Sequence, residues 1–241
     1  MSRPDGRAAD ELRPVTITPG FVRSASGSVL MEAGGTRVIC TASVVEDVPR
    51  WLRDKRRGWV TAEYSMMPAS TGAGDRKPRD VTKGRLDGRS VEIQRLIGRS
   101  IRGVIDFEAL GERTVYVDCD VLEADGGTRC ASITGGFVAL HLAMKRLVAE
   151  EKLENVPLTG TVAAVSCGMI DGEARLDLDY IEDSSAEVDA NVVMTGDGGL
   201  VEVQATAERT PLSRASLDEM LALAAGGIEQ LKAAQETAAA S

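Results

Sequence analysis

The order of the apolar patterns constrains this fold more than any other feature of the chain. Strand-like runs, in which apolar and polar residues alternate, give way to segments with the three- and four-residue spacing of a helix, and the chain passes through this change twice. Runs of strands punctuated by helices predict an α+β architecture. We therefore expect a pseudo-duplicated strands-then-helix fold. Because no linker rich in Pro, Ser or Gly divides the chain, we expect one domain over 1–241 with two quasi-repeated halves.

Turn residues separate the expected strands. Gly34-Gly35 lies between two segments rich in Val, Ile and Thr, and Asp171-Gly172 between two more, so both pairs are predicted to be hairpins. The motif Gly34-Gly35-Thr36-Arg37 occurs again as Gly126-Gly127-Thr128-Arg129, a short repeat of the kind that two related halves would leave. The expected strands are 28–32, 37–45, 59–66, 114–122, 161–170, 174–178, 187–194 and 200–206.

Three helices are expected. The first covers 93–105, the second opens near Ser132, and the third begins within 213–216. Ser216 and Glu219 have the spacing of a capping box at the start of the third helix. The Ala-rich end of that helix is expected to fray.

Length and cysteine usage bound the class of protein. A chain of 241 residues buries about 70–75% of its unfolded surface, which is enough for a full core without disulfides. No run of 18 apolar residues occurs and 1–6 lacks an apolar signal core, so neither a membrane span nor a secretory signal is predicted. The four cysteines are far apart in the sequence, which indicates free thiols in the cytoplasm rather than a zinc site or a disulfide framework.

The net charge of −9 hides two unlike regions. Residues 50–102 hold fourteen basic and six acidic residues, a net charge of +8, and the remainder carries −17. Because exposed charges are screened beyond about 8 Å at physiological salt, a local basic patch outweighs a distant acidic total. The basic segment is either a solvated face with some salt bridges or a surface that binds a polyanion. With only eight aromatic residues in the chain, a nucleic acid bound here is expected to be read through its backbone more than its bases.

The stretch 125–136 is the most informative candidate site. It is rich in glycine, follows an expected strand and opens the second helix. Glycine allows close approach of the backbone to a ligand, and a helix start offers unpaired N–H groups to an anion. Thr128 adds a hydroxyl donor and Arg129 a bidentate fork for phosphate. The alternative is a plain strand-to-helix turn with a surface arginine, and neither a Walker A nor a dinucleotide-binding motif is present.

A second candidate is acidic. The segment 177–189 holds six Asp and Glu residues, and Asp183 and Asp189 flank a Ser-Ser turn from which both side chains can reach one site. Clustered carboxylates suit a hard cation such as Mg²⁺, and a carboxyl with a raised pKa can act as a general acid. The alternative is an exposed acidic hairpin. His141, the one histidine, lies in the middle of the second helix and is expected in the core or at its boundary.

Several motifs together resemble the ribonuclease PH family, phosphate-dependent 3′→5′ exoribonucleases that trim tRNA precursors. The resemblance runs over nearly the whole chain and the motifs occur in the family's order. They are Arg3-x-Asp5-Gly6-Arg7, Asp10-Glu11-Leu12-Arg13-Pro14, Gly58-Trp59-Val60-Thr61-Ala62-Glu63-Tyr64-Ser65-Met66, Glu92-Ile93-Gln94-Arg95-Leu96-Ile97-Gly98-Arg99, Asp118-Cys119-Asp120-Val121, Ala124-Asp125-Gly126-Gly127-Thr128-Arg129 and Glu182-Asp183-Ser184-Ser185-Ala186-Glu187-Val188-Asp189.

The resemblance implies both an assembly and a reaction. The assembly is a ring-shaped homohexamer, a trimer of dimers. In the reaction, orthophosphate replaces water as the attacking nucleophile at the 3′ end of a tRNA precursor or another RNA, beyond CCA. A nucleoside 5′-diphosphate leaves, and the reverse reaction adds nucleotides from nucleoside diphosphates.

The resemblance also implies roles for particular residues. Phosphate is expected at Arg89, Gly127, Thr128 and Arg129. A divalent cation, Mg²⁺, and general-acid catalysis are expected at Asp183 and Asp189, with Asp189 protonating the leaving 3′ oxygen. The residues expected to bind the body of the RNA are Arg76, Lys77, Arg79, Lys83 and Arg85.

Two departures and one alternative accompany this interpretation. Cys130 stands where the family more often has threonine, and the 68–85 loop has its own sequence, which leaves its RNA contacts open. The competing hypothesis is a non-catalytic RNA-binding subunit of an exosome-like ring. Such subunits typically lack the site residues, and this chain retains all of them.

Overall fold

Nine strands form two sheets. The structure is a computed structural model that describes residues 3–72, 74, 76–79, 82, 84, 87–208 and 211–240. The first sheet has the order β1-β2-β3-β5-β4, antiparallel except for the parallel β4–β5 pair, and the second has the order β7-β6-β8-β9, antiparallel throughout. The strands are β1 Val15–Pro19, β2 Gly27–Ala33, β3 Thr36–Val45, β4 Trp59–Met66, β5 Thr114–Glu123, β6 Val162–Ile170, β7 Glu173–Leu176, β8 Val188–Thr195 and β9 Leu200–Ala207.

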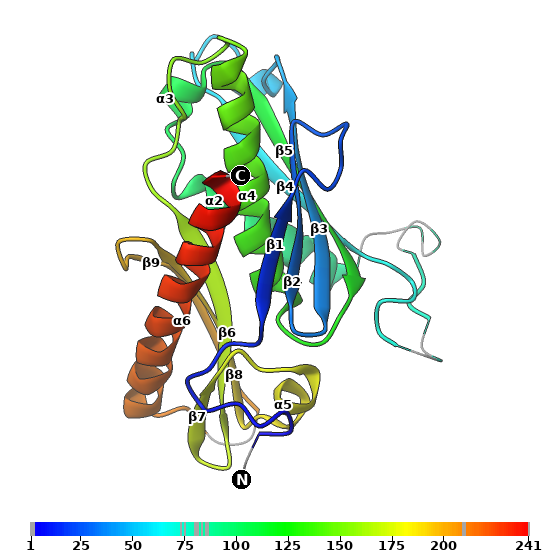
Figure 1. Ribbon diagram of the computed structural model, residues 1–241, viewed down its shortest axis with the longest axis vertical. Coiled ribbons are helices and arrows are strands. Elements are labelled where there is room, and N and C mark those ends of the chain that lie inside the picture. The colour runs from blue at the N-terminus through cyan, green and yellow to red at the C-terminus, as the bar shows by residue number, and fades with distance from the viewer. Residues whose placement is uncertain are drawn as a thin grey trace.

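Two long helices join the sheets. Helix α4 contacts β2, β3 and β5 of the first sheet and β6 of the second, whereas α6 contacts β6, β7 and β8 of the second sheet and β1 of the first. Figure 1 shows both helices running along the long axis of the molecule beside the sheets. The helices are η1 Arg50–Leu52, α2 Gly88–Arg102, α3 Phe107–Leu110, α4 Thr128–Ala149, α5 Tyr180–Ser185 and α6 Arg214–Ala240. The predicted α+β class is confirmed.

The main core spans both sheets. It contains residues of β2 to β6 and β8 together with those of α2, α4 and α6. The inward residues of β5 are Val115, Val117, Cys119 and Val121, each at most 1% exposed, as the alternation predicts. Phe137 and Met144 fill the centre from α4. None of the helices in the described ranges is both long and apolar enough to cross a bilayer.

Several element boundaries differ from expectation. Strand β1, which lies at the edge of the first sheet and pairs with β2, was not expected from the sequence. Helix α4 begins at Thr128 rather than near Ser132. The first turn of α6 is capped by Ser213, whose Oγ accepts from the Ser216 N–H at 3.0 Å, so the Ser216 capping box is wrong.

The expected fraying at the C-terminal end is also wrong. Helix α6 remains helical through Ala240, with Ala238 and Ala239 buried. The Lys145 Nζ of α4 donates to the Ala239 carbonyl oxygen at 2.5 Å, which ties the end of α6 to its neighbour. Tertiary contact, which local composition does not report, therefore holds this end.

The close approach of α4 to the first sheet depends on Gly135. A methyl group at this position would lie 2.8 Å from the Met31 Cβ and 2.9 Å from the Cys40 sulfur. Such overpacking costs about 1–3 kcal/mol, which exceeds the roughly 1 kcal/mol that Ala gains over Gly in a helix. We expect Gly135→Ala to lower the free energy of unfolding measured in urea.

The matched control is Gly226→Ala in α6. It brings the same gain in helix propensity, and a methyl group there meets no atom within 4 Å. We expect it to raise the free energy of unfolding by about 0.5–1 kcal/mol. A rise for both variants would contradict tight packing of α4 on the sheet.

Candidate active site

The start of α4 is an uncapped helix end. Gly126 and Gly127 have φ angles of +75° and +65°, a left-handed conformation that favours glycine, and the helix begins at the next residue. Among the described residues, no side chain caps this helix start with a hydrogen bond. The first amides of a helix have no partner within the helix, so this turn offers N–H donors and the positive end of the helix dipole to an anion.

Contacts distant in sequence hold this turn. The Thr36 hydroxyl donates to the Gly126 carbonyl oxygen at 2.6 Å and accepts from the Asp125 N–H at 2.9 Å. The two Gly-Gly-Thr-Arg motifs, which begin at Gly34 and Gly126, are therefore in direct contact. In the first turn of α4, the Thr128 Oγ1 lies 2.9 Å from the hydroxyl of Tyr64, which is buried at β4.

Two arginines converge on the same region from different helices. Arg89 lies in the first turn of α2, and its N–H donates to the side chain of the capping Asp87 at 3.4 Å. The Arg129 Nη1 donates to Gln204 Oε1 at 2.8 Å and lies 3.4 Å from Glu92 Oε1. Burial raises the pKa of Tyr64, and the charges of both arginines oppose that rise. Both guanidinium groups therefore act on the turn that carries Thr128.

The acidic segment is a short helix between two strands, so the exposed acidic hairpin is wrong. Three of its acidic residues, Asp177, Asp179 and Glu182, are buried and hydrogen-bonded. The Asp179 side chain caps α5 by accepting from the Glu182 N–H at 2.9 Å.

The two remaining carboxylates of interest reach one pocket from different elements. Asp183 comes from α5, and Asp189 comes from β8, where it pairs with Gly168 and Thr206. Desolvation by the surrounding protein and the charge of Asp189 raise the pKa of the Asp183 carboxyl, against the opposing charges of Arg89 and Arg129.

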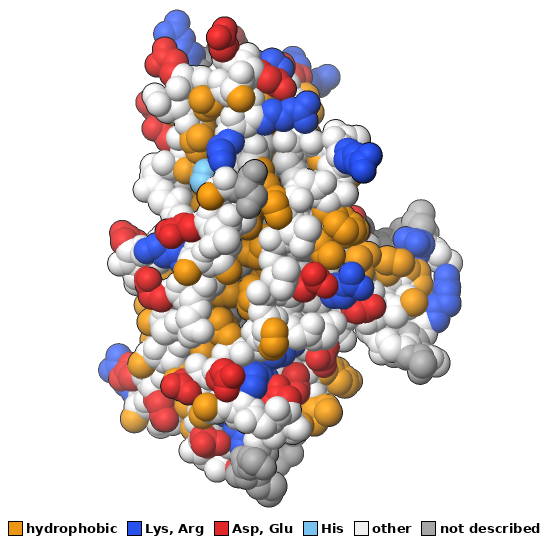
Figure 2. Space-filling model, in the orientation of Figure 1, with side chains coloured by type: hydrophobic (Ala, Val, Ile, Leu, Met, Phe, Trp, Pro, Cys, Tyr) orange, Lys and Arg blue, Asp and Glu red, His pale blue; other side chains and the backbone are white. Residues whose placement is uncertain are grey.

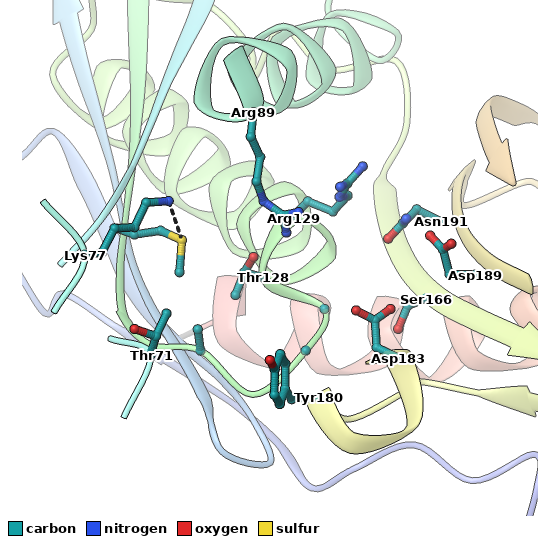
Figure 3. A pocket seen from close by; sticks show the side chains of 14 residues that line it. Thr71, Lys77, Arg89, Thr128, Arg129, Ser166, Tyr180, Asp183, Asp189 and Asn191 are labelled. Carbon is teal, nitrogen blue, oxygen red and sulfur yellow. Dashed lines mark hydrogen bonds between the residues drawn. The ribbon is translucent and has the colours of Figure 1, made fainter. Parts of the chain in front are cut away.

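One pocket of about 420 Å³ brings these groups together. Figure 3 shows Arg89, Arg129 and Thr128 toward one side and Asp183 and Asp189 toward the other. All six residues predicted for phosphate and metal, Arg89, Gly127, Thr128, Arg129, Asp183 and Asp189, line this pocket. Ser166, Tyr180, Asn191 and Thr71 also line it and were not selected as site residues from the sequence. Tyr180 belongs to the acidic segment 177–189, whereas Ser166, Asn191 and Thr71 carry no local motif and come to the site through the fold.

The residues predicted to contact RNA do not all lie in the same place. Lys77 lines the pocket, where its Nζ lies 3.4 Å from the Met66 sulfur and 4.0 Å from Asp87 Oδ2. Arg76 and Arg79 are exposed on the segment after β4, which extends away from the body in Figure 1. Figure 2 shows Lys and Arg side chains on this projection and frequent Asp and Glu at the lower end of the molecule. Lys83 and Arg85 lie outside the described residues.

Cys130 and His141 are not among the described residues that line the pocket. Cys130 is buried and its Sγ donates to Asn191 Oδ1 at 3.3 Å, which links α4 to β8. Burial raises the pKa of the Cys130 thiol to about 12, so it is not a nucleophile despite its place at a helix start. His141 is half-buried and packs beside Phe137, with 6.1 Å between ring centroids, as expected for the core boundary.

Two sequence profiles of one family match the chain. The 3′ exoribonuclease family, domain 1, matches residues 11–145, and domain 2 of the same family matches residues 160–227. The chain belongs to the 3′ exoribonuclease family. The predicted resemblance is thereby confirmed, whereas the folding of both halves as one domain stays a prediction. Within this family, the chain is 56% identical over 237 residues to ribonuclease PH of Syntrophomonas wolfei, which covers 98% of each chain.

Solved structures share the family fold. Rrp46 of rice has a TM-score of 0.78 at 18% identity, over 98% of this chain and 99% of that one. The Archaeoglobus fulgidus exosome with RNA bound to the active site has a TM-score of 0.79 at 23% identity, over 96% of this chain and 92% of that one. These similarities bear out the predicted fold.

Proposed function

We propose that the chain is a phosphate-dependent 3′→5′ exoribonuclease that trims the 3′ ends of tRNA precursors beyond CCA and of other RNAs. The observation that carries this proposal is the arrangement of the pocket. Groups that can donate hydrogen bonds to an anion, from α2 and the start of α4, lie opposite two carboxylates from α5 and β8. A site that must hold an anionic nucleophile next to an anionic scissile phosphate needs donors that bind the first anion and carboxylates that hold a cation against the second.

Orthophosphate is assigned to the basic side of the pocket. The N–H groups at Gly127 and Thr128 and the guanidinium groups of Arg89 and Arg129 offset its charge. The Tyr64 hydroxyl can donate to Thr128 Oγ1 at 2.9 Å, which leaves the Thr128 hydroxyl proton for a phosphate oxygen. Preorganised donors of this kind favour the charge that develops as the nucleophile attacks.

Asp183 and Asp189 are the proposed ligands of Mg²⁺. This ion takes one or two protein carboxylates and completes its octahedron with water and substrate phosphates, so a pair of carboxylates is a sufficient donor set. Burial, and after it the negative charge of Asp189, raises the pKa of the Asp183 carboxyl, so a cation beside the two carboxylates would favour their charged form. When bound, Mg²⁺ would neutralise charge on the scissile phosphate.

The reaction is a displacement at the terminal phosphodiester. A phosphate oxygen bonds to the phosphorus and the bond from phosphorus to the 3′ oxygen breaks. Asp189 is the proposed donor of the proton to that oxygen, and the attacking hydrogen phosphate supplies the proton that Asp189 passes on. The products are a nucleoside 5′-diphosphate and an RNA shorter by one nucleotide. Since one phosphate bond replaces another of similar energy, the reaction is reversible and nucleoside diphosphates extend RNA at low phosphate.

Arg76, Arg79, Lys83 and Arg85 are proposed to bind the body of the RNA, with Lys77 nearer the reacting end. We further propose a homohexameric ring, a trimer of dimers, that acts in the cytoplasm. Exposed large apolar side chains such as Val45 and Tyr116 support association with other copies. Mass measurement in solution at low and high salt tests the assembly.

The proposed activity predicts a specific product. We expect RNA extended beyond CCA to shorten only when both Mg²⁺ and orthophosphate are present, and to release nucleoside 5′-diphosphates, measured by chromatography of labelled products. Degradation without phosphate, or release of monophosphates, would overturn the proposal. RNA binding without any diphosphate release would instead support the non-catalytic ring subunit.

Asp189→Asn tests the proton donor. The change keeps the shape of the side chain and removes its acid, so we expect turnover to fall by about 10²–10⁴. The control is Asp171→Asn in the β6–β7 turn, where the φ angle of +51° suits asparagine and turnover should not change. Near-normal turnover in Asp189→Asn would show that another group delivers the proton.

Arg89→Ala tests the phosphate site. We expect the KM for orthophosphate to rise by about tenfold or more, since a hydrogen bond to a charged group contributes roughly 1.5–3 kcal/mol. The KM for RNA should change less. Arg146→Ala, which removes an exposed partner of Glu150 on α4, is the control. An unchanged dependence on phosphate would contradict the assignment of Arg89.

A further inference from the structure

The N-terminal segment buries charged side chains that the reaction does not use. Arg3 and Arg13 are 5% and 4% exposed, although charged residues are almost never fully buried unless they are paired. Figure 1 shows this segment passing beside β7 and α5 before it enters β1. Its arginines meet two buried carboxylates, Asp177 and Glu182, close to the pocket.

Arg13 supports the turn that starts α4. Its Nε and Nη2 donate to the two Asp177 carboxylate oxygens at 3.0 and 2.7 Å, and its backbone N–H donates to the same carboxylate at 2.8 Å. Its Nη1 donates to the carbonyl oxygen of Asp125, the residue before Gly126. A Cβ on Gly127 would lie 3.0 Å from the Arg13 Nη2. The guanidinium group therefore lies directly beneath the proposed phosphate turn.

Arg3 supports α5 instead. Its Nε and Nη2 donate to the two Glu182 carboxylate oxygens at 3.0 and 2.7 Å, and Arg175 Nη1 donates to one of them at 3.2 Å. A helix of six residues does not hold itself in water. Glu182 directs its side chain away from solvent, and successive residues are about 100° apart around a helix. Anchoring Glu182 therefore sets the direction of Asp183.

We propose that Arg13 and Arg3 are positioning residues for two different parts of the site. Arg13 sets the phosphate turn at Gly126 and Gly127, and Arg3, through Glu182, sets the Asp183 carboxylate. Both arginines also contact Asp177. Its side chain accepts from Arg13, and its carbonyl oxygen accepts from Arg3 at 3.0 Å. The inference deepens the proposed function and rests on it for the identity of the two ligands.

The test compares Arg13→Lys with Arg3→Lys. Lysine keeps the buried charge and loses the planar fork, so it cannot keep both sets of contacts. Calorimetry with orthophosphate alone and with Mg²⁺ alone measures each half of the site without turnover. We expect Arg13→Lys to weaken orthophosphate about tenfold, which corresponds to roughly 1.4 kcal/mol, and to leave Mg²⁺ within about twofold. We expect the opposite for Arg3→Lys.

Kinetics provide the second readout. Arg13→Lys should chiefly raise the KM for phosphate, whereas Arg3→Lys should lower kcat by about 10–100-fold, since a displacement of about 1 Å can reduce the rate by 10². Arg146→Lys, an exposed arginine paired with Glu150, should change none of these values. All values are normalised to the folded fraction from circular dichroism.

Suppose that both variants lose turnover equally while their affinities for orthophosphate and Mg²⁺ are unchanged. The arginines would then only stabilise the fold, and the inference would be overturned. If a lysine variant does not fold, Glu182→Gln replaces Arg3→Lys and is expected to weaken Mg²⁺ alone. Asp177→Asn replaces Arg13→Lys and is expected to weaken orthophosphate. RNA degradation by the unmodified protein without phosphate would overturn the proposed function, whereas the two binding measurements would still decide the positioning roles.

Discussion

The left-handed turn at Gly126 and Gly127 is the constraint on which the rest of the site depends. It ends the link from β5 and begins α4 with N–H groups that have no partner within the helix, and no side chain in the described part of the chain caps this helix start. A methyl group on Gly126 would lie 2.6 Å from the Leu178 carbonyl oxygen, so the turn also touches the segment that leads into α5. The N–H and guanidinium groups of the first half and the carboxylates of the second half are therefore joined through backbone segments in direct contact.

The charge distribution follows from this arrangement. The basic residues between 50 and 102 supply Arg89 and the projecting segment, while the acidic remainder supplies Asp183 and Asp189. A net charge of −9 is the sum of these two regions and describes neither of them. Because screening limits exposed charges to about 8 Å, the local groups decide which ligand each region attracts.

The sequence predicted those features that local pattern reports. Burial on one face imposes alternation, which located β5, and the family resemblance pointed to six residues that are among those lining the pocket. The start of α4 was misplaced because Ser132 looks like a cap, whereas its hydroxyl donates to the Thr128 carbonyl oxygen inside the helix at 2.8 Å. Strand β1 follows Pro14 and ends at Pro19, and these two prolines obscured its alternation. The burial of Asp177 and Glu182 was unpredictable because their partners Arg13 and Arg3 are more than 160 residues away.

Opposite charges in one pocket would neutralise one another if they could pair, and the fold keeps them apart. Arg129 is held toward Gln204 of β9 and Glu92 of α2, and Asp189 is fixed within the ladder of β8. Among the described residues, no ion pair joins Asp183 or Asp189 to Arg89 or Arg129, although these arginines oppose the rise in the pKa of Asp183 from within the same pocket. The separation leaves a positive and a negative wall in one pocket. Groups that the fold holds apart in this way need no rearrangement when charge develops between them.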